Sequence, residues 1–142
     1  MKNTKVADVM SMQPYVIDPE ATLRDAAIRM EAFECGALPV EFQGKLVGII
    51  TDRDIVIMGL AEDKDPDVAV VGEIMATDVF TCKPTDSLLE AADFMADQGV
   101  RRLVVVDEHG GVKGLVSISD MLKRPDIDKV DDDVVHHLFK YA

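Results

Sequence analysis

The stretch Val6-Ala7-Asp8-Val9-Met10 returns 65 residues later as Val71-Gly72-Glu73-Ile74-Met75. The same offset aligns identical residues along much of the chain, and one extra residue in the second copy then aligns Gly48 with Gly114 and Asp54 with Asp120. The other identical pairs are Pro19 and Pro84, Leu23 and Leu88, Ala26-Ala27 and Ala91-Ala92, Met30 and Met95, Leu38 and Leu103, and Val40 and Val105. Self-similarity at a fixed offset indicates a duplicated structural unit.

The duplication divides the chain into four parts. The first repeat covers residues 6–61, an acidic linker covers 62–70, the second repeat covers 71–124, and residues 125–142 form a C-terminal segment. That segment has apolar residues at helical spacing, so we expect a helix there. They are Val130, Val134, Val135, Leu138 and Phe139. This helix would either close over an exposed face of its own chain or contact a second copy.

Each repeat predicts the same order of elements. An extended segment, residues 15–17 or 79–82, precedes a helix that starts with a capping box, Thr22-x-x-Asp25 or Ser87-x-x-Glu90. Helical spacing predicts a core-facing side made of Leu23, Ala26, Ala27, Met30 and Phe33 in one copy and Leu88, Ala91, Ala92 and Met95 in the other. Two strands follow, residues 37–41 with 46–50 and residues 103–106 with 112–116, and a second helix then begins at Thr51 or Ser117.

The predicted unit is therefore β-α-β-β-α, and the predicted fold class is α/β of the α+β kind. A sheet this small cannot bury a face alone, so we expect the two repeats to pack sheet to sheet about a pseudo-twofold axis.

Composition excludes several classes of function. The chain has 142 residues, of which 48% are hydrophobic, and a formal net charge of -12. Such a charge repels the phosphates of nucleic acids and anionic membrane surfaces, so we expect no nucleic-acid or membrane partner. No signal-peptide core and no apolar run near the ~20 residues of a membrane span is visible. Two cysteines are too few for a disulfide scaffold, which indicates a cytoplasmic protein.

Two stretches identify a family by resemblance. Gly36-Ala37-Leu38-Pro39-Val40 with Leu46 to Asp54, and Val100 to Asp107 with Gly114 to Asp120, resemble the signature of CBS (cystathionine-β-synthase) domains. The second stretch is similar to the nucleotide-binding motifs in the γ subunit of AMP-activated protein kinase. The resemblance implies a Bateman module of two motifs with two ligand clefts, pairing into a homodimer. It implies AMP, ADP or ATP as the ligand, or in some members S-adenosylmethionine or NADH, and regulation of a partner protein that the sequence does not identify.

The resemblance implies a ligand site in the second repeat made of Thr81, Arg101, Arg102, Ser117, Ser119 and Asp120. From spacing alone, Ser117-x-x-Asp120 predicts a helix start, with the hydroxyl capping and the acid near the positive end of the dipole. As a ligand site, the Asp120 carboxylate would accept hydrogen bonds from ribose hydroxyls, with Thr81 beside the purine. The arginine pair would bind phosphate through its planar forks, or else simply solvate an acidic surface.

The corresponding residues of the first repeat are Val16, Thr51, Arg53 and Asp54. Asp54 keeps the ribose-type carboxylate, and Arg53 is a phosphate candidate. Val16 replaces the threonine, and Gly36-Ala37 replaces the arginine pair. We therefore expect the two sites to be unequal. In both repeats, Gly48 or Gly114 would let the backbone approach the ligand closely.

No catalytic or metal-binding pattern accompanies these motifs. The sequence contains no Ser-His-Asp order and no P-loop, and Cys35 and Cys82 lack C-x-x-C spacing. We therefore expect neither an enzyme nor a required cofactor or metal. The leading hypothesis is an adenine-nucleotide sensor that signals to a partner through ligand-dependent conformation. The alternative is a ligand-free dimeric scaffold or stress-type protein that uses the same fold for protein contacts.

Overall fold

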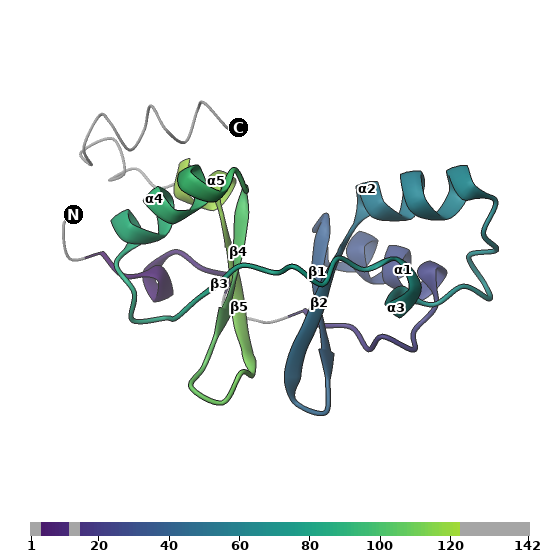
Figure 1. Ribbon diagram of the computed structural model, residues 1–142, viewed down its shortest axis with the longest axis horizontal. Helices are drawn as coiled ribbons and strands as arrows, with labels where there is room; N and C mark the ends of the chain where they lie inside the picture. Colours follow the sequence, from purple (N-terminus) through teal and green to yellow (C-terminus); the bar gives the residue numbers. More distant parts are fainter. Residues whose placement is uncertain (1–3, 12–14, 123–142) are drawn as a thin grey trace. The chain divides into compact units, whose positions relative to one another are not determined.

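The computed structural model describes residues 4–11 and 15–122 (Figure 1). The chain divides into two compact units. Unit 1 contains residues 1–14, 80–109 and 113–142, and unit 2 contains residues 15–79 and 110–112. Both units combine helices with a small sheet, so the predicted α+β class is confirmed. The predicted packing of one sheet on the other stays a prediction.

Unit 2 is a β-hairpin with helices on one side of it (Figure 1). Strands β1 and β2 pair antiparallel from Ala37 opposite Thr51, with an irregularity between Val40 and Glu41. The elements are α1 (Leu23–Phe33), β1 (Ala37–Phe42), β2 (Lys45–Thr51), α2 (Asp52–Asp54), a π-helical turn (Ile55–Gly59), a 3₁₀ turn (Leu60–Glu62) and α3 (Val71–Ile74). We call residues 52–62 the second helix of unit 2.

Unit 1 repeats this plan with a three-stranded sheet in the order β3-β4-β5. Strand β3 runs parallel to β4, with Thr81 opposite Val104 and Cys82 opposite Val105. The elements are a 3₁₀ turn (Val6–Asp8), β3 (Thr81–Cys82), α4 (Leu88–Gln98), β4 (Arg102–Val106), β5 (Val112–Ser117) and α5 (Ile118–Leu122). In unit 2 the counterpart of β3 is a single parallel bridge between Ile17 and Val40, so the predicted strand at residues 15–17 is reduced to one bridge.

The opening segments of the two repeats, residues 4–10 and 71–75, are exchanged between the units, and we call them the first and second lead segments. The first lead segment packs on the second repeat, where Val6 N donates to Asp86 O at 2.9 Å and Leu88 N donates to Thr4 O at 2.9 Å. The second lead segment packs on the first repeat, where Gly72 N donates to Pro19 O at 2.8 Å. Each compact unit therefore combines most of one repeat with the opening residues of the other.

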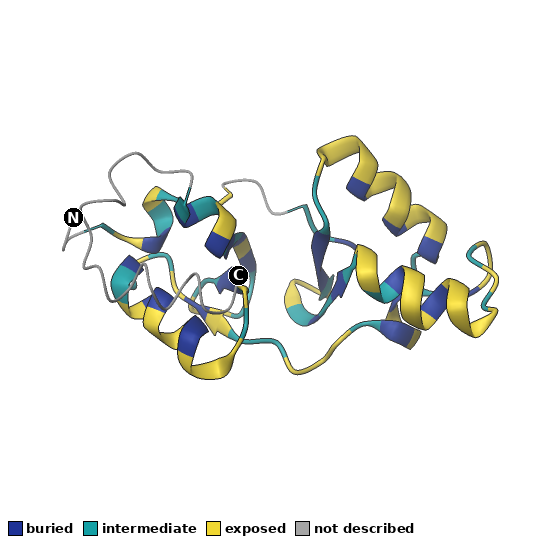
Figure 2. Ribbon diagram, turned by 90° about the horizontal axis from the view of Figure 1, so that it is seen from above, coloured by how far each residue is buried: buried dark blue, intermediate teal, exposed yellow. Residues whose placement is uncertain are grey.

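Each unit has its own apolar core, coloured dark blue in Figure 2. The core of unit 1 includes Val6, Leu88, Met95, Leu103, Val105, Val116 and Met121. The core of unit 2 includes Leu23, Met30, Leu38, Val40, Ile50, Val71 and Ile74. All four residues predicted for the core side of α4 are buried, which confirms that helix face.

The predicted core side of α1 is wrong at two positions. Leu23, Ala26 and Met30 are buried, but Ala27 is exposed and Phe33 is 43% exposed. Phe33 lies at the last residue of α1 and stacks on Tyr15, with ring centroids 4.0 Å apart. Ala27 lines a surface groove that faces solvent.

Within residues 4–11 and 15–122, no helix combines the length and the apolar character needed to cross a membrane. The helix predicted for residues 125–142 lies outside the described residues.

Candidate ligand-binding site

The predicted ligand residues of the second repeat gather where β4 begins and β5 ends. Arg102 is the first residue of β4, Ser117 is the last residue of β5, and Thr81 pairs with Val104 further along β4. Ile118 N donates a 2.9 Å hydrogen bond to Arg101 O, which ties the start of α5 to the start of β4. We call the set Thr81, Arg101, Arg102, Ser117, Ser119 and Asp120 the repeat-2 site.

The predicted capping box at the start of α5 is confirmed. Ser117 N donates to Asp120 Oδ2 at 3.0 Å, and Asp120 N donates to Ser117 Oγ at 3.1 Å. Within the described part of the chain, the second carboxylate oxygen, Oδ1, has no hydrogen-bond partner. The cap thus fixes the orientation of the half-buried Asp120 side chain and leaves one of its oxygens able to accept hydrogen bonds.

Unit 2 has the same arrangement in the first repeat: a backbone hydrogen bond ties the helix start to the strand start, and a capping box orients the aspartate. We call this arrangement the frame of each unit. Asp52 N donates to Gly36 O at 3.0 Å, which is the counterpart of the Ile118–Arg101 bond. Thr51 N donates to Asp54 Oδ2 at 2.9 Å and Asp54 N donates to Thr51 Oγ1 at 3.1 Å. Val16 precedes Ile17, and Ile17 forms a parallel bridge with Val40 of β1. We call the set Val16, Thr51, Arg53 and Asp54 the repeat-1 site.

Both sets are accessible to a ligand. Thr81, Arg101 and Ser119 in unit 1 and Arg53 in unit 2 are exposed. The remaining members are half-buried, namely Arg102, Ser117, Asp120, Val16, Thr51 and Asp54. A half-buried carboxylate beside exposed donors is a suitable arrangement for binding a polar ligand.

Sequence reasoning missed Asp52, which lies beside Arg53 and Asp54 of the repeat-1 site at the start of α2. A Cβ built on Gly36 would lie 3.0 Å from Asp52 Oδ2, so this carboxylate lies over the start of β1. Its counterpart in the second repeat is Ile118, which is buried in the core of unit 1. Comparing all four positions of the two capping boxes, instead of only the first and the last, would have found this difference.

The proposed role of Gly48 and Gly114 in ligand approach is wrong. A Cβ on Gly114 would lie 2.2 Å from Ser11 O, and a Cβ on Gly48 would lie 2.8 Å from Ala76 O. Both glycines therefore make room for the backbone that follows an exchanged lead segment. Ser11 N donates to Leu115 O at 2.9 Å, and Ile49 N donates to Ala76 O at 2.9 Å, which holds these close approaches in place.

The two cysteines differ in their surroundings. Burial raises the pKa of Cys82 from 9.0 to about 12, and Asp86 adds to this shift. Burial also raises the pKa of the half-buried Cys35, and the nearby charge of Asp52 contributes to it. Both thiols are therefore protonated at neutral pH. Within the described residues, no group of three or more His, Cys, Asp or Glu side chains is placed to hold a metal ion.

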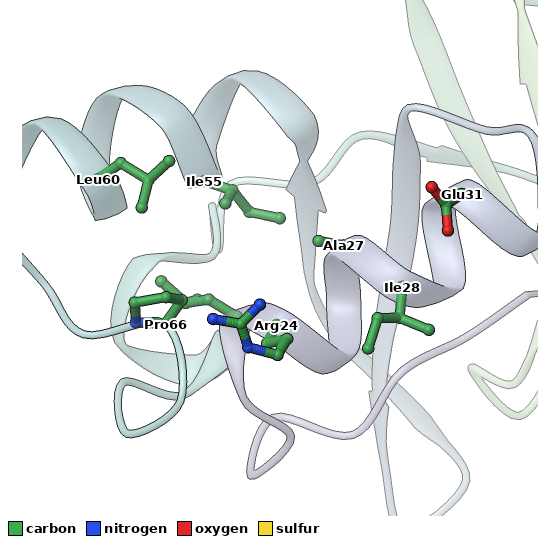
Figure 3. A pocket seen from close by; sticks show the side chains of 8 residues that line it. Arg24, Ala27, Ile28, Glu31, Ile55, Leu60 and Pro66 are labelled. Atoms are coloured by element: carbon green, nitrogen blue, oxygen red, sulfur yellow. The ribbon is translucent and has the colours of Figure 1, made fainter.

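A groove of about 350 Å³ lies elsewhere on unit 2, between α1 and the second helix (Figure 3). Its lining consists of Leu23, Arg24, Ala27, Ile28, Glu31, Ile55, Leu60 and Pro66. At its edge Arg24 pairs with Asp67, and this guanidinium lowers the pKa of the Asp67 carboxyl. None of the repeat-1 residues lines this groove, so it is a feature separate from the candidate site.

The family model described as "CBS domain" matches the chain twice, over residues 6–58 and 71–126. A relative of similar length is the CBS domain-containing protein YhcV of Bacillus subtilis. It is 36% identical over 118 residues, which cover 83% of each chain.

Two solved structures share both the fold and a substantial part of the sequence. Hypoxic Response Protein I, solved with two coordinated zinc ions, is 34% identical, with a TM-score of 0.75 over 85% of this chain and 98% of that one. The CBS domain pair of protein MJ0100, solved in complex with 5′-methylthioadenosine and S-adenosyl-L-methionine, is 30% identical. Its TM-score is 0.76 over 84% of this chain and 94% of that one.

Proposed function

The chain is a member of the CBS domain family, and we propose that it is a regulatory module that binds an adenine nucleotide and signals to a partner protein. The observation that carries the proposal is the duplicated frame around Asp54 and Asp120. In each unit, the helix start is tied to the strand start, and the cap uses one oxygen of the aspartate. The other oxygen is left to accept from a ribose hydroxyl.

The repeat-2 site offers the more complete set of groups for a nucleotide. Arg101 and Arg102 stand at the start of β4, and a guanidinium donates two parallel hydrogen bonds to a phosphate. Ser117 and Ser119 add hydroxyl groups at the start of α5, and Thr81 lies in the strand next to β4. We assign the adenine base to the Thr81 side, the ribose to Asp120 and the phosphates to the arginines.

The ligand class also draws support from a relative. The CBS domain pair of protein MJ0100 was solved with 5′-methylthioadenosine and S-adenosyl-L-methionine, which share an adenosine group. The arginine pair in this chain favours a phosphorylated adenosine, so AMP, ADP and ATP are the proposed ligands. The proposed role is regulatory rather than catalytic, and the proposed assembly is a homodimer in the cytoplasm.

Thermal unfolding with a panel of ligands tests this function. AMP, ADP, ATP, S-adenosylmethionine and NADH are each added to the purified chain. A ligand present at 100 times its dissociation constant stabilises the folded state by about 2.7 kcal/mol, a shift of roughly 5–10 °C for a domain of this size. We expect AMP, ADP or ATP to give the largest shift. If no compound shifts the midpoint at millimolar concentration, the proposed function is wrong.

A second candidate function is a dimeric scaffold without a ligand. It is favoured by the exposed apolar side chains on the helices of unit 2, where Ile28 is 57%, Val56 52% and Leu60 54% exposed. Exposed apolar surface of this kind is typical of a protein contact. A stable dimer that shows no response to the ligand panel would favour the scaffold over the sensor.

A further inference from the structure

The start of β1 in unit 2 faces a carboxylate, whereas the start of β4 in unit 1 carries arginines. Gly36 is the structural counterpart of Arg101, because their carbonyl oxygens accept equivalent hydrogen bonds from Asp52 N and Ile118 N. A Cβ on Gly36 would lie 3.0 Å from Asp52 Oδ2. The Asp52 carboxylate therefore lies where a side chain at position 36 would begin.

Asp52 is held in this orientation by its own helix start. Its Oδ1 accepts a 2.8 Å hydrogen bond from Arg53 N, while Oδ2 faces Gly36. The charge of Asp52 also affects the pKa of Cys35, the residue just before Gly36. Burial is the main cause of the raised pKa of Cys35, and the charge of Asp52 raises that pKa further.

The two frames consequently differ in the sign of their local charge. Across six equivalent positions, unit 1 has two arginines and one aspartate, an excess of one positive charge. Unit 2 has one arginine and two aspartates, an excess of one negative charge. The positions compared are residues 101–102 with 117–120 and residues 36–37 with 51–54.

We propose that Asp52 excludes phosphate from the repeat-1 site, so that this site takes an adenosine derivative whose 5′ group is uncharged or positively charged. The inference rests on the proposed function, because it takes the ribose to be bound by Asp54. Asp52 lies on the same helical turn as Asp54. A phosphate on such a ribose comes within about one Debye length of the Asp52 carboxylate, ~8–10 Å, where two negative charges repel.

Three probes that differ only at the 5′ position test this specificity. They are adenosine, AMP and 5′-amino-5′-deoxyadenosine, titrated by calorimetry into an Asp120→Asn background that weakens binding at the repeat-2 site. We expect the amine to bind most tightly and AMP most weakly, with at least about a tenfold difference between adenosine and AMP. Adding Asp52→Asn should reduce the difference between adenosine and AMP by roughly tenfold and remove the preference for the amine.

Asp63→Asn is the matched control. It removes the same charge just after the second helix, and asparagine tolerates the left-handed backbone of that residue, where φ is 59°. We expect this control to leave the order of the three probes unchanged. If adenosine binds but Asp52→Asn does not alter its ratio to AMP, the role of Asp52 is wrong and the proposed function stands. If none of the probes binds to any variant or to the wild-type chain, the proposed function fails as well.

A second measurement needs no ligand. The rate of thiol alkylation reports on Cys35, because Cys82 is buried and its pKa is about 12. Asp52→Asn removes a negative charge that raises the pKa of Cys35, so alkylation at a fixed, mildly alkaline pH should become faster. An unchanged rate in a folded Asp52→Asn protein would show that this charge does not act at the start of β1, and the inference would be overturned.

Discussion

At the residue scale, Asp120 has a structural role and a proposed binding role in one carboxylate. Its Oδ2 accepts from Ser117 N at 3.0 Å, so replacing the side chain affects the helix start as well as any ligand. Loss of a capping group costs about 1 kcal/mol of stability. Asparagine at position 120 separates the capping role from the binding role, because its side-chain oxygen can still accept the hydrogen bond from Ser117 N while the negative charge is lost.

We predict that Asp120→Asn weakens AMP or ATP binding by about 1.5–3 kcal/mol, which is roughly tenfold or more, while the protein stays folded. Asp120→Ala should lose the same affinity and also destabilise the start of α5. Asp86→Asn is the control, because Asp86 also accepts a hydrogen bond from a backbone amide, that of Lys83 at 2.8 Å, outside the site. Calorimetry that shows unchanged affinity in folded Asp120→Ala protein would contradict the assignment.

The raised pKa of Cys82 predicts that the free energy of unfolding decreases at alkaline pH. Its pKa is about 12 in the folded protein against 9.0 for an unperturbed thiol, so the folded state holds the proton over a range where the unfolded chain has lost it. The contribution of this thiol to stability is therefore complete below pH 9 and is lost progressively as the pH rises toward 12.

We expect the free energy of unfolding to fall less between pH 9 and pH 11 in Cys82→Ala than in the wild type. Urea unfolding of both proteins at each pH measures this difference. Cys35→Ala serves as the comparison, since the shift of that half-buried thiol is smaller. A difference between wild type and Cys82→Ala that does not change with pH would contradict the assignment of this slope to Cys82.

At the element scale, the exchanged lead segments hold each unit together, and the glycines of β2 and β5 permit their approach. Gly114 faces Ser11 O and the Met10 side chain, and Gly48 faces Met75 and Ala76. These contacts explain why the two repeats share a glycine at this position without reference to a ligand.

We predict that Gly114→Ala destabilises the protein by about 1–3 kcal/mol, because a Cβ 2.2 Å from Ser11 O forces the backbone apart. Gly110→Asn is the matched control in the turn before β5. Gly110 has a φ of 84° and no heavy atom within 4 Å of a built Cβ, and asparagine tolerates this backbone region. Equal stability of Gly114→Ala and wild type in urea unfolding would contradict the close packing of this segment.

The order of elements was predictable from the sequence because the period of 65 residues and the capping boxes are local signals. The strands predicted at residues 37–41, 46–50, 103–106 and 112–116 lie within a residue of their observed ends for the same reason, whereas those predicted at 15–17 and 79–82 are reduced to a single bridge and to a two-residue strand. The exchange of the lead segments was not predictable, because a repeat shows which residues correspond and not which copy each segment packs against. Ala27 was misplaced because helical spacing alone does not show whether a neighbouring element covers that side.

The candidate site was predictable only in part. The spacing of Thr51 with Asp54 and of Ser117 with Asp120 predicted both capping boxes, which are confirmed. The carboxylate of Asp52 over Gly36 depends on a backbone hydrogen bond between two distant segments, and spacing within one helix contains no such information.

At the scale of the whole molecule, the two repeats differ in how much apolar surface their helices expose. The large exposed apolar side chains on the helices of unit 2 are Ile28, Phe33, Val56, Ile57, Met58 and Leu60. On the helices of unit 1, within the described residues, Phe94 alone falls in this class, at 36% exposed. The apolar surface available for the homodimer that the family resemblance implies therefore lies mainly on the helices of unit 2.

We predict a homodimer through this surface. Sedimentation at micromolar concentration should give twice the chain mass of 15.6 kDa, and Leu60→Asp should shift it toward the monomer. Phe42→Asp is the control, because Phe42 is similarly exposed, at 45%, and lies at the end of β1 instead of on a helix. A wild-type monomer under these conditions would contradict the prediction.

We propose that one nucleotide site, built on Asp120 and the arginine pair, is filled before the other. Its most direct test is a calorimetric titration of the wild-type chain with AMP, repeated with adenosine and with Arg102→Ala. We predict two unequal steps or one AMP per chain, and a smaller difference between the sites in Arg102→Ala with adenosine binding nearly intact. Two identical sites for AMP, or a first-repeat site that fills ahead of the second, would show that the arginine pair does not set the order of binding.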